Sequence, residues 1–142
     1  MARMNLLESP VNPGDQLDYY RIDRVVAQSS AATVFRATDV RTSTEVAIKI
    51  PHREMESDPT FADRFTREME IGEVLDHPNI IKVIADRNRT GIYMVMEWFD
   101  GKTLRNILKE GGTLAPERAV RIAAAVCDAL EYIHTRGIVH GD

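Results

Sequence analysis

Three features that often reveal function are scarce in this sequence of 142 residues: cysteine, long apolar runs and an excess of basic residues. The single cysteine, Cys127, cannot form an internal disulfide, which fits a reducing compartment. No apolar run approaches the roughly 18 residues that cross a membrane, and the first residues lack the apolar stretch of a signal peptide. We therefore expect a soluble, cytoplasmic protein with no membrane segment.

Charge and histidine spacing argue against two further kinds of site. Eighteen basic and 22 acidic residues give a formal net charge of −4 without a basic block, so nucleic acid is not an expected partner. The four histidines are scattered without the spacing of metal ligands, and we assign no metal site to the chain. The remaining composition is ordinary for a globular domain that buries one core.

The first two thirds of the chain read mainly as strands. Turn dipeptides fill residues 1–16, which we interpret as a flexible lead-in. Alternating apolar residues then predict strands, and the short links between the first three predict an antiparallel meander. One helix with an apolar face is predicted to begin at Asp58-Pro59 and to stop at His77-Pro78. The five predicted strands cover residues 18–26, 33–38, 45–50, 80–84 and 92–96.

The last third reads as helical after a short connector at residues 97–102. A short helix is predicted over residues 103–110 and a longer one over residues 116–135. Ala115 stands at the N-cap of the longer helix, where Ser or Asp would stabilise it by roughly 1 kcal/mol more. The apolar side of this helix carries Ala119, Ile122, Ala123, Val126, Leu130 and Ile133.

Lys49 lies near the end of the apolar strand at residues 45–50. Lysine is almost never fully buried unless it is paired, so Lys49 needs either water or an anion. Glu68 follows 19 residues later, on a predicted helix that comes directly after this strand and can pack across it. The two side chains can therefore pair. The alternatives are an ordinary charge at a strand end for Lys49 and a solvated helix surface for Glu68.

The order of these segments resembles the protein kinase family, in particular the eukaryotic-type serine/threonine kinases of bacteria. Residues 46–49 match the V-A-I-K strand of the family, and residues 64–68 resemble its αC segment. Residues 77–80 resemble the turn after αC, and residues 93–97 the strand that leads into the hinge. Residues 140–142 resemble the start of the H-R-D catalytic loop.

This resemblance implies an α+β fold with a kinase N-lobe at residues 17–96, built from a five-stranded antiparallel sheet and the αC helix. Residues 97–102 would be the hinge, and residues 103–142 the first helices of an incomplete helical C-lobe. The resemblance further implies ATP and Mg²⁺ as cofactors and a protein hydroxyl group as the substrate that accepts phosphate.

The resemblance also assigns roles to individual residues. Lys49 and Glu68 would form the ion pair that holds ATP phosphates, and Asp142 would be the base that accepts the substrate hydroxyl proton. Val34 and Ala47 would cover the adenine. Met96 would be the gatekeeper, and the backbone of Glu97 and Phe99 would hydrogen-bond the base. The complete expected nucleotide set is Val26, Ala27, Ser29, Ala32, Val34, Ala47, Lys49, Met96, Glu97 and Phe99.

The loop that should cover the phosphates departs from the family pattern. Ala27, Ser29 and Ala32 stand where G-x-G-x-x-G has its glycines. Glycine permits positive φ and a close backbone approach to phosphates. Alanine and serine are small enough for that approach but make the flexible conformations costly. We expect either weaker nucleotide binding or a loop of another shape.

The end of the sequence departs as well. Gly141 replaces an arginine that commonly contacts a phosphorylated activation loop in the family, which predicts an activity independent of that phosphate. The family's Mg²⁺ ligands, the catalytic-loop Asn and the D-F-G Asp, do not follow Asp142, so we expect these residues alone to be inactive. We also expect the apolar side of helix 116–135 to be exposed and to bind a protein partner or a second copy.

Three hypotheses follow. The first is the N-terminal part of an ATP-dependent serine/threonine protein kinase. The second is a catalytically dead kinase-like docking or regulatory module, favoured by the loop without glycines and by His-Gly-Asp, and opposed by Lys49, Glu68 and Asp142. The third is a fragment without independent function. The codons after Asp142 would discriminate between them best.

Overall fold

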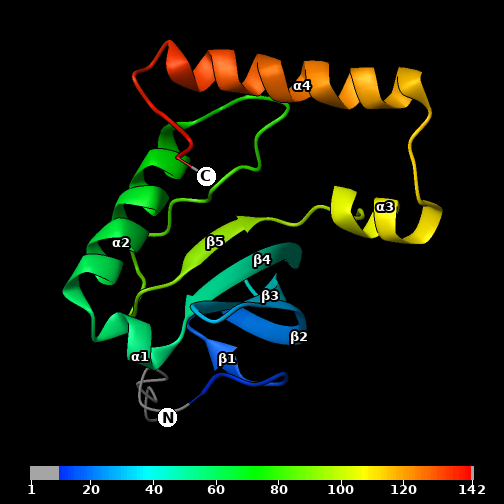
Figure 1. Ribbon diagram of the computed structural model, residues 1–142. Helices are drawn as coiled ribbons and strands as arrows, with labels where there is room; N and C mark the ends of the chain where they lie inside the picture. The colour runs from blue at the N-terminus through cyan, green and yellow to red at the C-terminus, as the bar shows by residue number, and fades with distance from the viewer. Residues whose placement is uncertain (1–9, 142) are drawn as a thin grey trace. The chain divides into compact units, whose positions relative to one another are not determined.

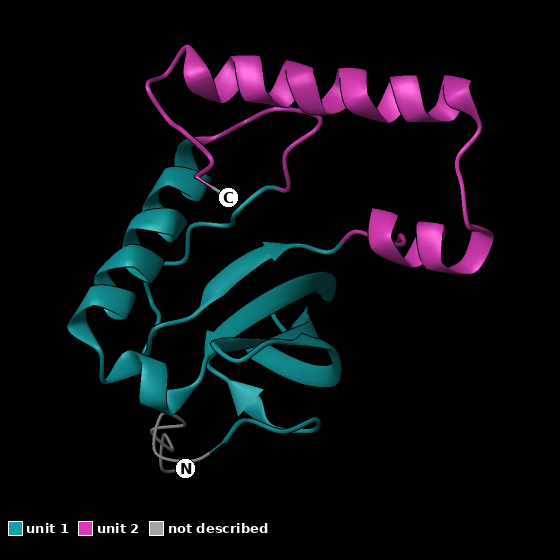
Figure 2. Ribbon diagram, viewed as in Figure 1, with its two compact units in different colours: residues 1–74, 82–98 teal, residues 75–81, 99–142 magenta. Residues whose placement is uncertain are grey.

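A computed structural model describes residues 10–141 and divides them into two compact units (Figure 2). The first unit comprises the chain up to Val74 together with Lys82–Trp98, and the second comprises Leu75–Ile81 together with the chain from Phe99 onward. The boundary between Trp98 and Phe99 lies inside the predicted hinge. Residues 75–81, within the range predicted for the N-lobe, group with the second unit.

The first unit contains a five-stranded antiparallel sheet in the order β1-β2-β3-β4-β5 (Figure 1). This confirms the predicted fold class and the predicted meander. The sheet is continuous in sequence order, so each of its first four strands pairs with the next along the chain. The strands are β1 Gln16–Leu17, β2 Tyr20–Gln28, β3 Ala32–Asp39, β4 Thr44–Pro51 and β5 Met94–Glu97.

The five strands are not quite the five predicted. Residues 80–84 form only an isolated bridge, between Val83 and Met96, and the prediction of a strand there is wrong. The Glu97 N–H donates to the Lys82 carbonyl at 2.9 Å, but the Lys82 N–H donates to the Glu97 side chain at 2.8 Å. A side-chain oxygen thus replaces the backbone carbonyl that would continue the ladder.

The short edge strand β1, which was not predicted, brings the number of strands in the sheet to five. Gln16 pairs with Arg21, and Leu17 with Tyr20, across a turn in which Asp18 has φ +51°. Residues before β1 are also attached, because the Ile22 N–H donates to the Asp15 carbonyl at 2.9 Å. Residues 10–16 therefore differ from the flexible lead-in that the sequence predicted, and residues 1–9 lie outside the described part.

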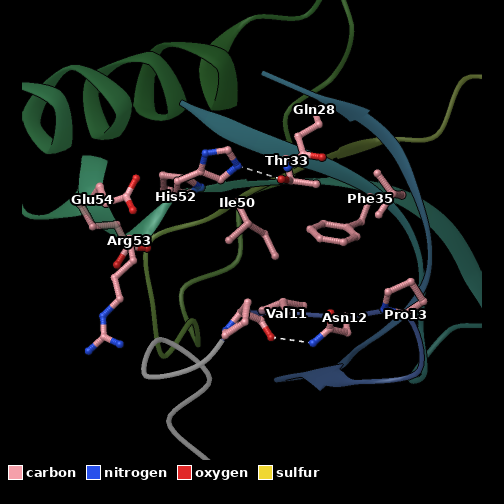
Figure 3. A pocket seen from close by; sticks show the side chains of 14 residues that line it. Val11, Asn12, Pro13, Gln28, Thr33, Phe35, Ile50, His52, Arg53 and Glu54 are labelled. Atoms are coloured by element: carbon pink, nitrogen blue, oxygen red, sulfur yellow. Dashed lines mark hydrogen bonds between the residues drawn. The ribbon is translucent and has the colours of Figure 1, made fainter. Parts of the chain in front are cut away.

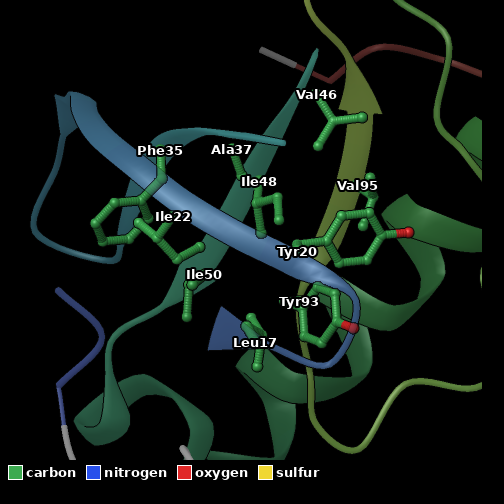
Figure 4. Close-up of a cluster of buried hydrophobic side chains, with 10 residues drawn as sticks. All are labelled: Leu17, Tyr20, Ile22, Phe35, Ala37, Val46, Ile48, Ile50, Tyr93 and Val95. Atoms are coloured by element: carbon green, nitrogen blue, oxygen red, sulfur yellow. The ribbon is translucent and has the colours of Figure 1, made fainter. Parts of the chain in front are cut away.

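Alternation along the strands gives the sheet one buried face (Figure 4). Successive side chains point to opposite faces, so residues two apart share a face. Ile48, Tyr93 and Val95 on this face have no exposed surface. The cluster comprises Leu17, Tyr20, Ile22, Phe35, Ala37, Val46, Ile48, Ile50, Tyr93 and Val95.

Two helices follow β4 in the first unit. The single turn α1 Arg53–Glu56 was not predicted, whereas α2 Pro59–Val74 confirms the predicted helix. Asp58 caps α2, since its carboxylate accepts the Thr60 N–H at 2.9 Å. Phe65 is the buried residue of α2 and packs in a second cluster with Val83 and Met94.

The second unit contains two helices, α3 Leu104–Gly111 and α4 Pro116–His134, both close to their predicted bounds. Ala115 provides no side-chain cap to α4, as expected. At its other end, the Ile138 N–H donates to the Ile133 carbonyl and the Gly137 N–H to the His134 carbonyl, with Gly137 at φ +72°. These two bonds form the usual glycine-terminated helix end.

The apolar side of α4 is covered unevenly. On that side Ile133 is buried and Leu130 is half-buried, whereas Val126 is 52% exposed. Val120, which lies outside that side, is 68% exposed. Within the second unit, the Asp76 N–H donates to the Tyr132 hydroxyl at 3.0 Å. No helix in residues 10–141 is long and apolar enough to cross a membrane.

Candidate functional site

Lys49 and Glu68 meet in the structure. The ammonium of Lys49 on β4 lies 3.2 Å from the carboxylate of Glu68 on α2. The buried ring of Phe65, one turn before Glu68, lies 5.6 Å from the Lys49 ammonium and packs beneath it. The Lys49 side chain is 30% exposed and that of Glu68 59% exposed, so the pair remains open to solvent and to a ligand.

The strand register places the predicted adenine-covering residues beside Lys49. Val34 lies opposite Lys49 in the β3–β4 ladder, and Ala47 lies opposite Met96 in the β4–β5 ladder. Ala27 on β2 lies opposite Val34. Because residues two apart share a face, these side chains lie on the face opposite the buried cluster. The small or aliphatic side chains of Ala27, Val34 and Ala47 therefore share a face with Lys49.

The predicted phosphate loop forms a tight hairpin between β2 and β3. Val26 is the extra residue at a register irregularity of β2, Ser29 begins the connection, and Ala32 is the first residue of β3. The only non-glycine residues with positive φ within residues 10–141 are Asp18 and Ser43. The loop thus adopts a shape that requires no glycine.

The remaining predicted residues are less informative. Glu97 is the last residue of β5, and its N–H is bonded to Lys82. Phe99 belongs to the second unit and is 71% exposed. Gly141 has φ +77°, a backbone conformation in which an arginine would be strained. Asp142, the predicted base, lies outside the described residues.

The sequence reasoning missed Arg89, which holds α2 against the sheet. Its guanidinium lies 2.8 Å from the carboxylate of Glu73 and also donates to the carbonyls of Asp86 and Tyr93, at 2.7 and 2.9 Å. The Arg89 side chain is 14% exposed and that of Glu73 is 23% exposed. Arg89 lies in the link between the strands predicted at residues 80–84 and 92–96, and no local signal connects it with Glu73, sixteen residues earlier.

A buried polar network lies at the end of the sheet where β2 begins and β3 ends. The Tyr20 hydroxyl donates to Asp86 at 2.8 Å, and burial together with this bond raises the pKa of Tyr20. Hydrogen bonds from the side chain of Arg41 hold the pKa of Asp39 below its usual value. Burial acts to raise the pKa of Asp86, but bonds from Asn88 and Tyr20 and the charge of Arg41 bring it below its usual value.

A cavity of about 530 Å³ opens on the core side of the sheet, beside β3, β4 and α1 (Figure 3). Phe35 and Ile50 form part of its lining, with His52 at one edge. Burial raises the pKa of Glu56, another lining residue, against the opposing charge of Arg53. No predicted nucleotide residue lines this cavity. In residues 10–141, no group of three or more His, Cys, Asp or Glu side chains could hold a metal ion.

Comparisons with known proteins agree with this geometry. The chain is 36% identical over 130 residues to a probable serine/threonine-protein kinase PknB of Corynebacterium glutamicum, covering 88% of this chain and 20% of that protein. It is 38% identical over 128 residues to a probable serine/threonine-protein kinase of Streptomyces coelicolor, covering 87% of this chain and 19% of that protein. The chain therefore spans about a fifth of the length of these curated relatives.

A solved structure and a family match extend the comparison. The PknI kinase domain of Mycobacterium tuberculosis superimposes with a TM-score of 0.79 at 26% sequence identity, covering 94% of this chain and 54% of that chain. Residues 20–142 match the family described as protein kinase domain. These residues include strands β2 to β5, α2 and the Lys49–Glu68 pair. The chain belongs to the protein kinase domain family.

Proposed function

We propose that this chain forms the ATP-binding part of a serine/threonine protein kinase, which transfers a phosphoryl group from ATP to a protein hydroxyl. The observation that carries this proposal is the contact between Lys49 and Glu68, 3.2 Å apart on the sheet face opposite the core. A carboxylate that holds the ammonium in place directs its charge toward ATP phosphates. The names of the curated relatives support the serine/threonine class.

The other roles follow from the same proposal. Val34 and Ala47 would cover the adenine from the sheet, with Met96 as gatekeeper. The backbone of Glu97 and Phe99 would hydrogen-bond the base. Together with Lys49, the expected contacts from the loop and β2 are Val26, Ala27, Ser29 and Ala32.

Asp142 would accept the proton of the substrate hydroxyl as the general base. The residues that hold Mg²⁺ in the family, the Asn of the catalytic loop and the Asp of D-F-G, come after the H-R-D Asp, which Asp142 matches. We therefore assign no Mg²⁺ ligand to this chain and derive no step through the metal. The use of ATP and the single cysteine support a cytoplasmic location for this part of the protein.

Nucleotide binding by the 142-residue chain tests the proposal. Isothermal titration with ATP should show binding, and Lys49→Met should weaken it about tenfold or more, because the phosphates lose their charged partner. Glu68→Gln should weaken it less, since Lys49 keeps its charge but loses its orientation. Lys109→Met, an exposed lysine on α3, is the matched control. Equal ATP affinity for wild type and Lys49→Met would overturn the assignment.

A second candidate function is a kinase-like docking module. The exposed Val120 and Val126 on α4 favour it, because a protein partner or a second copy would remove their surface from water. Light scattering and a hydrophobic dye test this on the same protein. We expect self-association or dye binding that Val120→Glu with Val126→Glu abolishes. A monomer that binds no dye would contradict the docking surface and leave the ATP site unaffected.

A further inference from the structure

We propose that the loop between β2 and β3 is capped by its own Ser29 and clamped by His52, so that its backbone does not grip nucleotide phosphates. Phosphate recognition would then fall mainly to Lys49, and the site would distinguish ATP from adenosine less than a glycine-rich loop does. This inference rests on the proposed ATP site and concerns which part of the nucleotide that site recognises.

The hydroxyl of Ser29 uses all of its hydrogen-bonding capacity within the loop. It accepts the N–H groups of Ala31 and Ala32 at 3.2 and 3.1 Å, and it donates to the Ala32 carbonyl at 3.2 Å. A serine hydroxyl has one donor and two acceptor sites, so the side chain is saturated. The Ser29 N–H also donates to the Ala32 carbonyl, at 2.9 Å. Ser29 therefore closes the hairpin from inside.

His52, just after β4, holds the tip of the same loop. Figure 3 shows its contact with Thr33. Its backbone N–H donates to the Ala31 carbonyl at 2.8 Å, and its ring Nδ1 lies 3.0 Å from the Ser30 carbonyl. A carbonyl can only accept, so Nδ1 carries the proton. In the neutral ring, Nε2 then accepts the hydroxyl of Thr33 at 2.9 Å. The side chain and backbone of His52 thus bind three residues of the hairpin, Ser30, Ala31 and Thr33.

These contacts leave the loop poorly suited to bind phosphate. Such loops present unpaired backbone N–H groups to phosphate oxygens, and glycine lets the backbone come close. Here the N–H groups of Ala31 and Ala32 already have an acceptor in Ser29. Their release would require breaking the cap, and moving the tip would require breaking the bonds to His52. The loop is therefore pre-shaped as a closed hairpin rather than open for phosphate.

The experiment compares two glycine substitutions in the same loop. Ser29→Gly removes the cap, whereas Ser30→Gly adds equal backbone freedom and leaves the Ser29 hydroxyl in place, which makes it the matched control. For each protein the ratio of ATP affinity to adenosine affinity is measured by titration. We expect Ser29→Gly to raise that ratio about tenfold and Ser30→Gly to change it less than about twofold. His52→Ala should raise it in the same direction.

Amide hydrogen exchange of Ala31 and Ala32, measured by NMR without nucleotide, tests the cap independently. Both amides should exchange at least about tenfold faster in Ser29→Ala than in the wild type, because the accepting hydroxyl is gone. Equal exchange rates in the two proteins would overturn the inference, as would an unchanged affinity ratio in Ser29→Gly. If the wild type binds neither ATP nor adenosine, the proposed function fails, and the exchange rates alone decide whether Ser29 caps the loop.

Discussion

The guanidinium of Arg89 lies 2.8 Å from the carboxylate of Glu73, five residues beyond Glu68 on the same helix. Arg89 belongs to the turn before β5, so this ion pair attaches α2 to the sheet that carries Lys49. Both side chains are largely withdrawn from water, and Arg89 has further bonds to backbone carbonyls. The position of Glu68 relative to Lys49 therefore depends on the Arg89–Glu73 ion pair, in which neither Lys49 nor Glu68 takes part.

Arg89→Ala should lower the free energy of unfolding by about 2 kcal/mol, because it leaves the half-buried Glu73 carboxylate unpaired. Urea unfolding measures this loss. Arg21→Ala, which removes an exposed pair with Asp23, should cost less than about 0.5 kcal/mol. A double-mutant cycle with Glu73→Ala should give a coupling above about 0.5 kcal/mol. Equal losses for Arg89→Ala and Arg21→Ala would contradict the anchoring role.

Gly72→Ala should destabilise the fold although alanine favours a helix by about 1 kcal/mol. A Cβ at Gly72 would lie 2.4 Å from Cγ2 of Val83, so α2 would have to move away from the sheet, at a cost of about 1–3 kcal/mol. Val83→Ala in the same protein should recover part of the loss. Thermal unfolding checks both, with Gly111→Ala as the control, because a Cβ there meets no atom within 4 Å. A stabilising Gly72→Ala would refute this packing.

Acid should weaken the fold through Asp39 and Asp86. The pKa of each carboxyl is lower in the folded protein than its ordinary value of about 3.9. Their ionised forms therefore stabilise the fold above that value, and the stabilisation is lost as the pH falls below about 4. Asp39→Asn should be less stable than the wild type at pH 7, and the difference should shrink toward pH 2.

Urea unfolding at several pH values measures this convergence for Asp39→Asn. The exposed Asp63 on α2 offers a comparison, and Asp63→Asn should show little difference from the wild type at pH 7. A stability gap between Asp39→Asn and wild type that stays constant from pH 7 to pH 2 would show that Arg41 stabilises the fold without the Asp39 charge.

Tyr93→Phe should cost about 1 kcal/mol, because it removes a hydrogen bond between a buried hydroxyl and a carboxylate. The Tyr93 hydroxyl donates to Asp18 at 2.6 Å, which connects the turn between β1 and β2 with the residue before β5. Burial and this bond raise the pKa of Tyr93. Differential scanning calorimetry measures the change, and Tyr19→Phe at an exposed position should have little effect. A larger loss for Tyr19→Phe would contradict this assignment.

Features that depend on nearby residues were predictable from the sequence. The period of the apolar residues identified β2, β3, β4 and α2, because a strand or helix shows its buried side at fixed intervals. The spacing from Lys49 to Glu68 predicted their contact, since the helix follows the strand directly. The order of motifs identified the family over most of the chain.

Features that depend on contacts between distant segments were not predictable from the sequence. The strand expected at residues 80–84 is interrupted because the side chain of Glu97 takes the Lys82 N–H, and periodicity carries no information about that competition. The absence of glycine from the loop was visible in the sequence. The contacts of Ser29 and His52, which shape this loop in the absence of glycine, were not visible in the sequence.

The sequence by itself therefore determined the family, the order of the elements and the candidate charges of the site, because these follow from local periodicity and motif spacing. Only the tertiary structure decided how those charges are held. Three contacts each join segments that lie apart in the chain: the packing of Gly72 against Val83, the ion pair of Arg89 with Glu73, and the bonds of His52 to the loop. Such contacts arise from packing between segments, and no pattern within either segment encodes its partner.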